Sequence, residues 1–151
     1  MDPYVILTHY GLLFFVGWVH EYREVRTFAV ERMKALEPTG REFQVRPDFS
    51  IEKLMADSFG VMHGEEPITV KVRFDKEVAD EVKYTTFHQS QKTEDLPNGD
   101  ILFEMRASDR EEIKNWIFSY HHWAEVLEPK ALRDEILREL KQCLAAYQKK
   151  R

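Results

Sequence analysis

The basic and aromatic side chains between residues 20 and 32 are the ones whose types and spacing could do chemistry in this sequence. The stretch HEYREVRTFAVER contains Tyr22, Arg23, Arg26, Phe28 and Arg32. A guanidinium group donates two hydrogen bonds at once to phosphate oxygens, and an aromatic ring stacks on a base. This combination is typical of sites that bind a nucleotide or single-stranded nucleic acid. The predicted chemistry is therefore ligand binding, without a covalent step.

Arg26 has a second interpretation, in which it is structural. Alternate residues of an extended strand share a face, so on a strand Arg26 points to the same side as Phe28 and Val30. There it could pair with Glu24 or Glu31 while its aliphatic stem covers apolar surface. Both interpretations of Arg26 remain open at the level of the sequence.

Composition and charge exclude several classes of protein. Twenty-two Lys and Arg against 27 Asp and Glu leave a net charge of -5, so the chain as a whole does not attract nucleic acid or acidic membranes. An anion site therefore needs a few arginines to converge locally. The most apolar run, GLLFFVGWV, is about half of the roughly 20 residues that a membrane helix needs. Cys143 is the only cysteine, which excludes an internal disulfide and favours a cytoplasmic location.

The sequence does not predict an enzyme. His121 and His122 are adjacent, so their side chains diverge by about 100° on a helix or face opposite ways on a strand, which is poor geometry for a shared metal ion. We expect His88 to pack or to form a hydrogen bond, and Cys143 to be a small buried side chain on the final helix. The chain has no phosphate-binding loop, nucleophile elbow or zinc-spaced pair. No cofactor and no metal are expected.

Residues 1–62 are predicted to form a small sheet or barrel. β-Branched and aromatic residues flank the turn His9-Tyr10-Gly11, which predicts a hairpin. Apolar residues on both faces of the strand over 12–19 predict that it is central and covered on both sides. A third strand over 25–39 is expected to continue through a bend near Glu31. These three strands in tandem are the elements that position the basic and aromatic side chains.

A short helix and a domain boundary follow the strands. Ser50 and Gly60 are typical of the N-cap and C-cap of a helix between them. The segment HGEEP over 63–67 has no large apolar residue beyond its histidine and separates two well-patterned regions. We therefore predict two domains, 1–62 and 67–151.

The first half of the second domain reads as strand, helix and hairpin. ITVKVRF over 68–74 alternates like a half-buried strand, and Asp75 is placed to cap the helix after it. Asn98-Gly99 separates two strand-like runs, 84–91 and 100–108. This dipeptide between such runs is a strong signal for a β-hairpin.

The second half of this domain supplies two helices and the last strand. Ser108 and Glu111 form a capping-box pattern before a helix whose apolar residues share one face. WAEVLEP predicts the last strand, and Pro129 is expected to start the final helix. The apolar stripe of that helix consists of Leu132, Ile136, Leu137, Leu140, Leu144 and Tyr147. The order βαββαβ plus a helix is the ferredoxin-like arrangement.

Four stretches, taken in order along the chain, carry a resemblance to a known family. They are PYVILTHYGLLFFVGW, REVRTFAVERM, FHQSQ and EVLEPKALRDEI. In these stretches the sequence resembles the WYL-domain transcriptional regulators of bacteria, with their C-terminal WCX extension. The resemblance implies an α+β fold, in which a partial Sm-like or SH3-like small β-barrel is followed by a ferredoxin-like domain with a C-terminal helix.

The sequence departs from the family pattern in two places. The name-giving Trp-Tyr-Leu corresponds to Phe14-Phe15-Val16, which keeps the apolar bulk and loses two hydrogen-bond donors. Family members carry an N-terminal winged helix-turn-helix and an opening barrel strand, whereas this chain starts at Met1-Asp2-Pro3-Tyr4. We therefore expect no sequence-specific duplex binding by this chain alone. We also expect an open strand edge that a partner chain could cover.

Together, the residues and the resemblance predict a regulatory, ligand-sensing domain of a transcriptional regulator. The expected partner is a nucleotide-like effector or single-stranded nucleic acid, bound by Arg23, Arg26, Phe28, Arg32 and Tyr22. The alternative is a module that binds no ligand and serves dimerisation and signal transmission. Its partner would be a second copy, giving a homodimer, or a separate DNA-binding chain. No membrane partner is expected.

Overall fold

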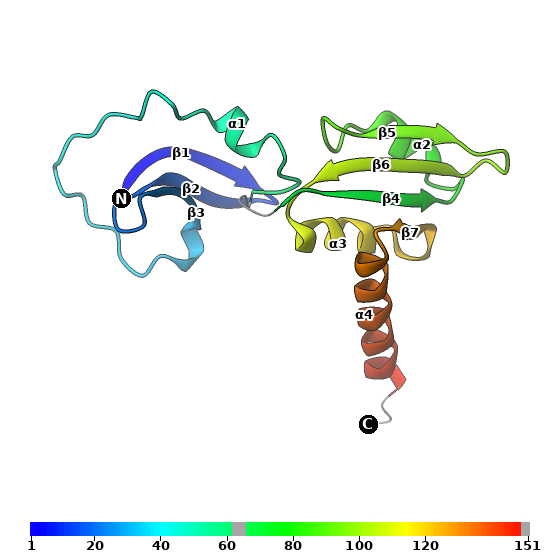
Figure 1. The fold of residues 1–151 in the computed structure, drawn as a ribbon. Coiled ribbons are helices and arrows are strands. Elements are labelled where there is room, and N and C mark those ends of the chain that lie inside the picture. The colour runs from blue at the N-terminus through cyan, green and yellow to red at the C-terminus, as the bar shows by residue number, and fades with distance from the viewer. Residues whose placement is uncertain (62–65, 149–151) are drawn as a thin grey trace. The chain divides into compact units, whose positions relative to one another are not determined.

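The computed structural model describes residues 1–61 and 66–148 (Figure 1). The chain divides into two compact units, Met1–Gly64 and Glu65–Arg151, and each unit has its own sheet. The fold is α+β with antiparallel sheets and a C-terminal helix, as the sequence predicts. The predicted boundary at 63–67 falls largely outside the described residues, so the predicted domain limits remain predictions. None of the described helices is long and apolar enough to cross a membrane.

The described part of the first unit is built on an antiparallel sheet in the order β1-β2-β3. β1 spans Asp2–His9, β2 spans Leu12–Val19 and β3 spans Glu24–Ala29. Tyr10 and Gly11 turn the chain between β1 and β2 with φ angles of 48° and 77°, the left-handed region that such tight hairpin turns require. The predicted hairpin and the central position of β2 are confirmed. The described residues show this sheet open, with β1 and β3 as its edges.

Strand pairing places alternate residues on two faces of this sheet. Arg26 of β3 lies opposite Gly17 of β2 on one face, and Val25 lies opposite Trp18 on the other. We call these the Arg26 face and the Trp18 face. Gly17 has no room for a side chain, because a Cβ there would lie 2.4 Å from the carbonyl oxygen of Asp2. The N-terminal end of β1 therefore closes tightly over β2 at this point.

The cover of β2 is less complete than predicted. Val16, in its middle, is fully buried, whereas Leu12 and Leu13 at its start are exposed. Residues 12–19 are therefore covered on both faces only in the second half of the strand.

The predicted continuation of β3 through Glu31 is wrong. β3 ends at Ala29, and a short 3-10 helix, η1 (Val30–Arg32), follows it. The carboxylate of Glu31 accepts a hydrogen bond from the backbone N–H of Leu13 at 3.2 Å. This side chain takes the place of the backbone acceptor that a longer β3 would have offered to β2, so the strand stops there.

The short helix α1 spans Ile51–Met55. Its N-cap was predicted correctly, whereas its predicted C-cap is wrong. Ser50 is the N-cap, as predicted, because its Oγ accepts a hydrogen bond from the backbone N–H of Lys53 at 3.2 Å. The helix ends at Met55, and Ala56 is its C-cap, whose N–H donates to the carbonyl of Lys53 in a tightened last turn. The predicted C-cap Gly60 lies beyond this end.

The described part of the second unit holds an antiparallel sheet in the order β5-β6-β4-β7. Its strands are β4 (Ile68–Phe74), β5 (Lys92–Asp95), β6 (Ile101–Ala107) and β7 (Ala124–Glu128). Its helices are α2 (Ala79–Tyr84), α3 (Arg110–Ser119), the 3-10 helix η2 (His121–Trp123) and α4 (Lys130–Gln148). The order βαββαβ plus a helix, with β4 between β6 and β7, confirms the predicted ferredoxin-like arrangement.

Aromatic rings form the centre of this second core. Trp116 of α3 lies 5.5 Å from the ring of Phe74 and 5.2 Å from that of Phe103, between ring centroids. The predicted apolar face of α3 is buried: it consists of Ile113, Trp116, Ile117 and Tyr120. The second unit therefore has an aromatic core of its own.

The predicted hairpin is present, but the strand predicted over 84–91 is wrong, because the first strand of the hairpin is β5 (Lys92–Asp95). Gly99 turns the chain with a φ of 90°, and β5 begins only at Lys92. Ahead of it, the side-chain amide of Gln91 accepts hydrogen bonds from the N–H groups of Phe87 and His88 and donates one to the carbonyl of Thr85. A side chain satisfies these backbone groups, so residues 84–91 need no neighbouring strand.

Two predicted helix caps in this unit are displaced. Asp109, not Ser108, is the N-cap of α3, and its carboxylate accepts a hydrogen bond from the N–H of Glu112 at 3.1 Å. Asp75 does not cap α2, because its carboxylate accepts a hydrogen bond from Glu77 in the turn before that helix. At α3 the capping residue is therefore the one after the predicted residue, and at α2 the predicted residue bonds within the preceding turn.

The apolar stripe of α4 is buried only at its N-terminal end. Leu132 and Ile136 are buried, whereas Leu137, Leu140, Leu144 and Tyr147 are exposed, with exposed fractions rising from 43% to 91%. Cys143 is also exposed, so its predicted burial is wrong. The physical reason is that the C-terminal half of α4 extends beyond the sheet on which its first turns pack (Figure 1).

Candidate functional site

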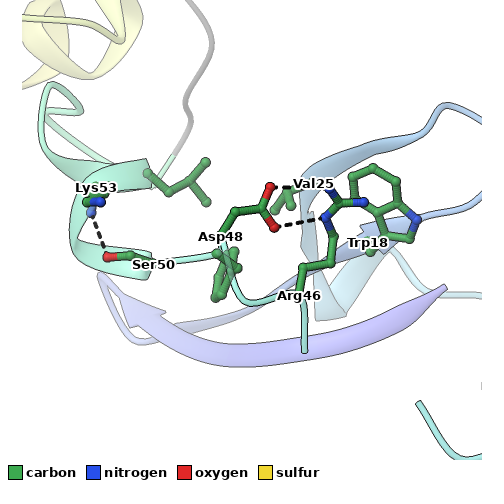
Figure 2. A pocket seen from close by; sticks show the side chains of 8 residues that line it. Trp18, Val25, Arg46, Asp48, Ser50 and Lys53 are labelled. Atoms are coloured by element: carbon green, nitrogen blue, oxygen red, sulfur yellow. Dashed lines mark hydrogen bonds and ion pairs between the residues drawn. The ribbon is translucent and has the colours of Figure 1, made fainter. Parts of the chain in front are cut away.

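A hollow of about 340 Å³ lies on the Trp18 face of the first unit (Figure 2). Strands β2 and β3 contribute one side, and the segment 46–54, which includes α1, contributes the other. The lining residues are Trp18, Val25, Arg46, Asp48, Phe49, Ser50, Lys53 and Leu54. The hollow therefore combines an aromatic ring, two cations, one carboxylate and apolar side chains.

Arg46 is held in this hollow by two contacts. Its Cζ lies 4.4 Å from the centroid of the Trp18 ring. Its Nε and Nη2 donate to the two carboxylate oxygens of Asp48 at 3.1 and 3.2 Å. This two-pronged hydrogen bonding raises the pKa of Arg46 and lowers that of Asp48. The guanidinium plane is therefore fixed over the indole ring.

Lys53 and Ser50 stand at the α1 side of the hollow. The Ser50 hydroxyl donates to Glu52 at 2.7 Å, which lowers the pKa of that carboxyl, while its oxygen caps α1. Within residues 1–61, no ion pair engages the ammonium group of Lys53. One cation of the hollow is thus paired and the other is available.

The predicted residues Tyr22 and Arg26 are in contact on the opposite face of the sheet. The Cζ of Arg26 lies 3.7 Å from the centroid of the Tyr22 ring, and its Nε donates to Glu24. Glu24 is one of the two partners that the structural interpretation of Arg26 offered. The stack on Tyr22 is an arrangement that also suits ligand binding.

The other predicted residues lie along the same strand or at its ends. Phe28 is on the Arg26 face, opposite Phe15 of β2. Arg23 precedes β3 in a turn with a φ of 55°, and Arg32 is exposed at the end of η1. In the described residues, no ion pair or ring contact joins Arg23 or Arg32 to the Tyr22–Arg26 pair. The structure thus brings two of the five residues into contact.

A second hollow, of about 370 Å³, lies further along the Arg26 face. Phe15, which lies opposite Phe28, is part of its wall, and Lys34 is its one charged lining residue. The full lining is Ile6, Leu13, Phe15, Val30, Met33, Lys34, Ala35 and Leu36. The Arg26 face therefore carries three features along the sheet: the Arg26 cation, the ring of Phe28 and this apolar hollow.

Sequence reasoning did not select Trp18 and Arg46 as site residues. Trp18 fits the apolar alternation of β2, and Arg46 lies in the irregular segment that follows η1, so no spacing connects them. The one available signal is the Arg46-Pro47-Asp48 stretch, in which a turn brings opposite charges together. Only the fold reveals that this turn lies against Trp18.

The histidines discussed above lie in the second unit. His121 and His122 lie in η2, before β7, and His88 is buried with its Nδ1 2.8 Å from the hydroxyl oxygen of Ser90. Among the described residues, no group of three or more His, Cys, Asp and Glu side chains is placed to hold a metal ion.

Two family models match this chain. The chain matches the WCX domain over residues 66–144 and the WYL domain over residues 1–38. No curated protein matches it. Among solved structures it is similar to the proteasome accessory factor B/C (PafBC) of Arthrobacter aurescens, with 24% sequence identity and a TM-score of 0.47. That match covers 97% of this chain and 22% of the PafBC chain, so the chain spans about a fifth of its length.

Proposed function

The chain belongs to the WYL–WCX family, whose domains are typical of the ligand-sensing regions of transcriptional regulators, and we propose that its first unit senses a phosphate-bearing ligand on the Arg26 face. The proposed ligand is a nucleotide-like effector or a stretch of single-stranded nucleic acid. The observation that carries the proposal is the Arg26 guanidinium, which is stacked on Tyr22 and still has free donors.

The donors of Arg26 suit a phosphate. A guanidinium has five N–H groups, and only the Nε group is used for Glu24. In the described residues the two terminal nitrogens have no protein acceptor, so they can donate in parallel to two phosphate oxygens. The Arg26 and Glu24 side chains are 42% and 51% exposed, and ion pairs that reach water contribute little energy. A phosphate can therefore compete with Glu24.

The neighbouring rings suit the rest of a nucleotide. The contact with Tyr22 restricts the Arg26 side chain, which reduces the ordering needed when a ligand binds. Phe28 lies two residues along the same strand, about 7 Å away, where a base whose phosphate contacts Arg26 could stack. Arg23 and Arg32 flank β3 at its two ends, where they would add salt-dependent attraction.

A binding titration of labelled single-stranded oligonucleotide, followed by fluorescence anisotropy, tests this proposal. We expect binding that weakens about tenfold in Arg26→Ala, because each lost bidentate contact removes a charge-assisted pair. Arg41→Ala is the matched control, since it removes the same charge from the same unit and should bind like the wild type. Equal binding by the wild type and a folded Arg26→Ala would rule the proposal out.

A second candidate function is self-association through α4. Leu137, Leu140, Leu144 and Tyr147 are exposed and spaced three, four and three residues apart, the spacing of a coiled-coil seam. We propose a second copy of this chain as the partner, because the same seam on both chains is self-complementary.

Sedimentation velocity measures this association directly. Leu140→Glu places a charge in the seam and is expected to shift the protein to monomer, whereas Gln142→Glu, on the other side of α4, should leave the dimer intact. A monomeric wild type at micromolar concentration would exclude this second function.

A further inference from the structure

We propose that the hollow on the Trp18 face is a second anion site, in which Asp48 occupies the anion position on Arg46 until a ligand replaces it. The proposed ligand is a small organic carboxylate with a flat apolar body. The site lies on the opposite face of the sheet from Arg26, so it is independent of the function proposed above.

The geometry of the Arg46–Asp48 pair is that of a bound carboxylate. Both oxygens of Asp48 accept hydrogen bonds from one edge of the guanidinium, at 3.1 and 3.2 Å. The carboxylate arrives there through a local turn, closed by the N–H of Phe49 bonding to the carbonyl of Arg46 at 3.0 Å. A carboxylate of a ligand could make the same two hydrogen bonds.

Asp48 can leave this position at little cost. The Arg46 and Asp48 side chains are 47% and 71% exposed, and pairs of such exposure are weakened by water and salt. Arg46 keeps a second contact when Asp48 turns away, because its guanidinium lies over the Trp18 ring whereas Asp48 bonds to its edge. After Asp48 turns away, Arg46 would remain where the ligand needs it.

The charge balance of the hollow also favours an anion. Its lining contains Arg46 and Lys53 as cations and Asp48 as its single carboxylate. Glu52 is turned toward Ser50 and does not line the hollow. Lys53 also lines the hollow, so once a ligand has displaced Asp48 the lining retains two cations and no carboxylate.

The remaining walls determine the body of the ligand. Trp18, Val25, Phe49 and Leu54 give the hollow a largely apolar surface. Phe49 is braced by Tyr4, with the two rings edge to face and 4.9 Å between their centroids. A volume of about 340 Å³ lies at the small end of ligand pockets, which span about 300–1,000 Å³. A flat apolar molecule with one carboxylate matches both the size and the lining.

Titration with 1-naphthoate, followed by the indole N–H signal of Trp18 in two-dimensional NMR, tests the proposal. Trp18→Phe assigns that signal among the three tryptophans. Asp48→Asn keeps the size of the side chain but removes the competing charge, so we expect it to bind naphthoate about tenfold more tightly than the wild type. Arg46→Gln should lose binding, and the dispersion of each spectrum reports whether the variant is folded.

Three results would overturn the proposal. The first is an Asp48→Asn variant that binds naphthoate no more tightly than the wild type. The second is a folded Arg46→Gln variant that binds as well as the wild type. The third is inorganic phosphate displacing naphthoate at equal concentration, which would refute the carboxylate class of the ligand.

The two faces can be tested separately. Arg26→Ala is expected to leave the affinity for naphthoate unchanged, and Arg46→Gln to leave the affinity for the oligonucleotide unchanged. The naphthoate titration can therefore refute the site at Arg46 without affecting the oligonucleotide test of the site at Arg26, and the reverse also holds.

Discussion

The guanidinium of Arg26 lies over the ring of Tyr22, with Cζ 3.7 Å from the ring centroid. The two residues are joined by a turn in which Arg23 has a φ of 55° and donates its backbone N–H to the carbonyl of Val19 at 2.8 Å. The turn between β2 and β3 thus determines where the cation lies. Because the contact is local, the cation is oriented on the exposed face of β3 before any ligand arrives.

Replacement of Tyr22 tests whether this orientation matters for binding. Tyr22→Leu removes the ring, and we expect oligonucleotide binding to weaken by about 0.5–1 kcal/mol, or roughly two- to fivefold, the value of an exposed cation–π contact. Tyr22→Phe keeps the ring and should bind like the wild type in the anisotropy titration. A loss of the same size in both variants would assign the effect to the hydroxyl instead.

Gly17→Ala tests the close approach of β1 to β2. The added methyl group would lie 2.4 Å from the Asp2 carbonyl oxygen and 2.7 Å from Cε of Met1, so the strand end has to move. We expect a loss of about 1–3 kcal/mol in the free energy of unfolding, measured by urea denaturation. Thr8→Ala, an exposed change on the same sheet, should have little effect. An unchanged midpoint for Gly17→Ala would show that this contact is easily relaxed.

Lys114 is expected to stabilise the docking of α4 on α3. Its buried ammonium donates to Glu139 of α4 at 2.6 Å and pairs with Glu111 at 2.8 Å. We predict that Lys114→Ala lowers the free energy of unfolding by about 1–3 kcal/mol, less than for a fully enclosed pair because both carboxylates reach water. Lys141→Ala, an exposed lysine of α4, is the control. Equal stability of the two variants would contradict this role.

The direction of the pKa shift of Lys114 determines how its contribution to stability depends on pH. Hydrogen bonds with Glu111 and Glu139 raise its pKa above 10.5. The folded state therefore holds this proton more tightly than the unfolded state. The stabilisation is complete below about pH 10.5 and is lost as the pH rises through the folded pKa.

Glu125 gives the second unit an acid-sensitive contact. Hydrogen bonds from Arg133 and the nearby Arg73 hold the pKa of its carboxyl below the ordinary 4.5. A lowered folded pKa means stabilisation above about pH 4.5 that is lost as the pH falls through the folded value. We expect Glu125→Gln to cost about 0.5–1 kcal/mol at pH 7, after allowing for solvent screening, and less at pH 3.

Thermal unfolding at pH 7 and pH 3 measures this difference. Glu94→Gln, an exposed change on β5, is the control, because it also removes one carboxylate. A destabilisation by Glu125→Gln that is the same at both pH values would contradict the assignment to charge.

The sequence predicts those parts of the fold that depend on local chemistry. Asn98-Gly99 favours a hairpin whatever surrounds it, and the spacing of Ile113, Trp116 and Ile117 defines a buried helix face. Predictions failed where a side chain replaced a backbone partner. The carboxylate of Glu31 accepts a hydrogen bond from the N–H of Leu13, where β3 ends. The side chain of Gln91 accepts hydrogen bonds from the N–H groups of Phe87 and His88, in a loop that was predicted as a strand.

The two candidate sites differ in how much of each could be predicted from the sequence. Tyr22 and Arg26 were both selected from one short stretch, but their contact depends on the turn at Arg23, whose backbone conformation the residue spacing does not reveal. Trp18 and Arg46 meet only because the irregular segment after η1 returns to the sheet, and no periodicity in the sequence records that path. The exposure of Cys143 likewise depends on where the sheet ends beneath α4.

Replacement of Glu24 provides the most direct test of the proposed phosphate site, because it changes the charge beside Arg26 without touching Arg26 itself. Glu24→Gln removes the carboxylate that competes with a phosphate for the guanidinium. In the anisotropy titration of single-stranded oligonucleotide at low salt, the site predicts tighter binding by Glu24→Gln than by the wild type, opposite in sign to Arg26→Ala. Unchanged or weaker binding by a folded Glu24→Gln variant would contradict it.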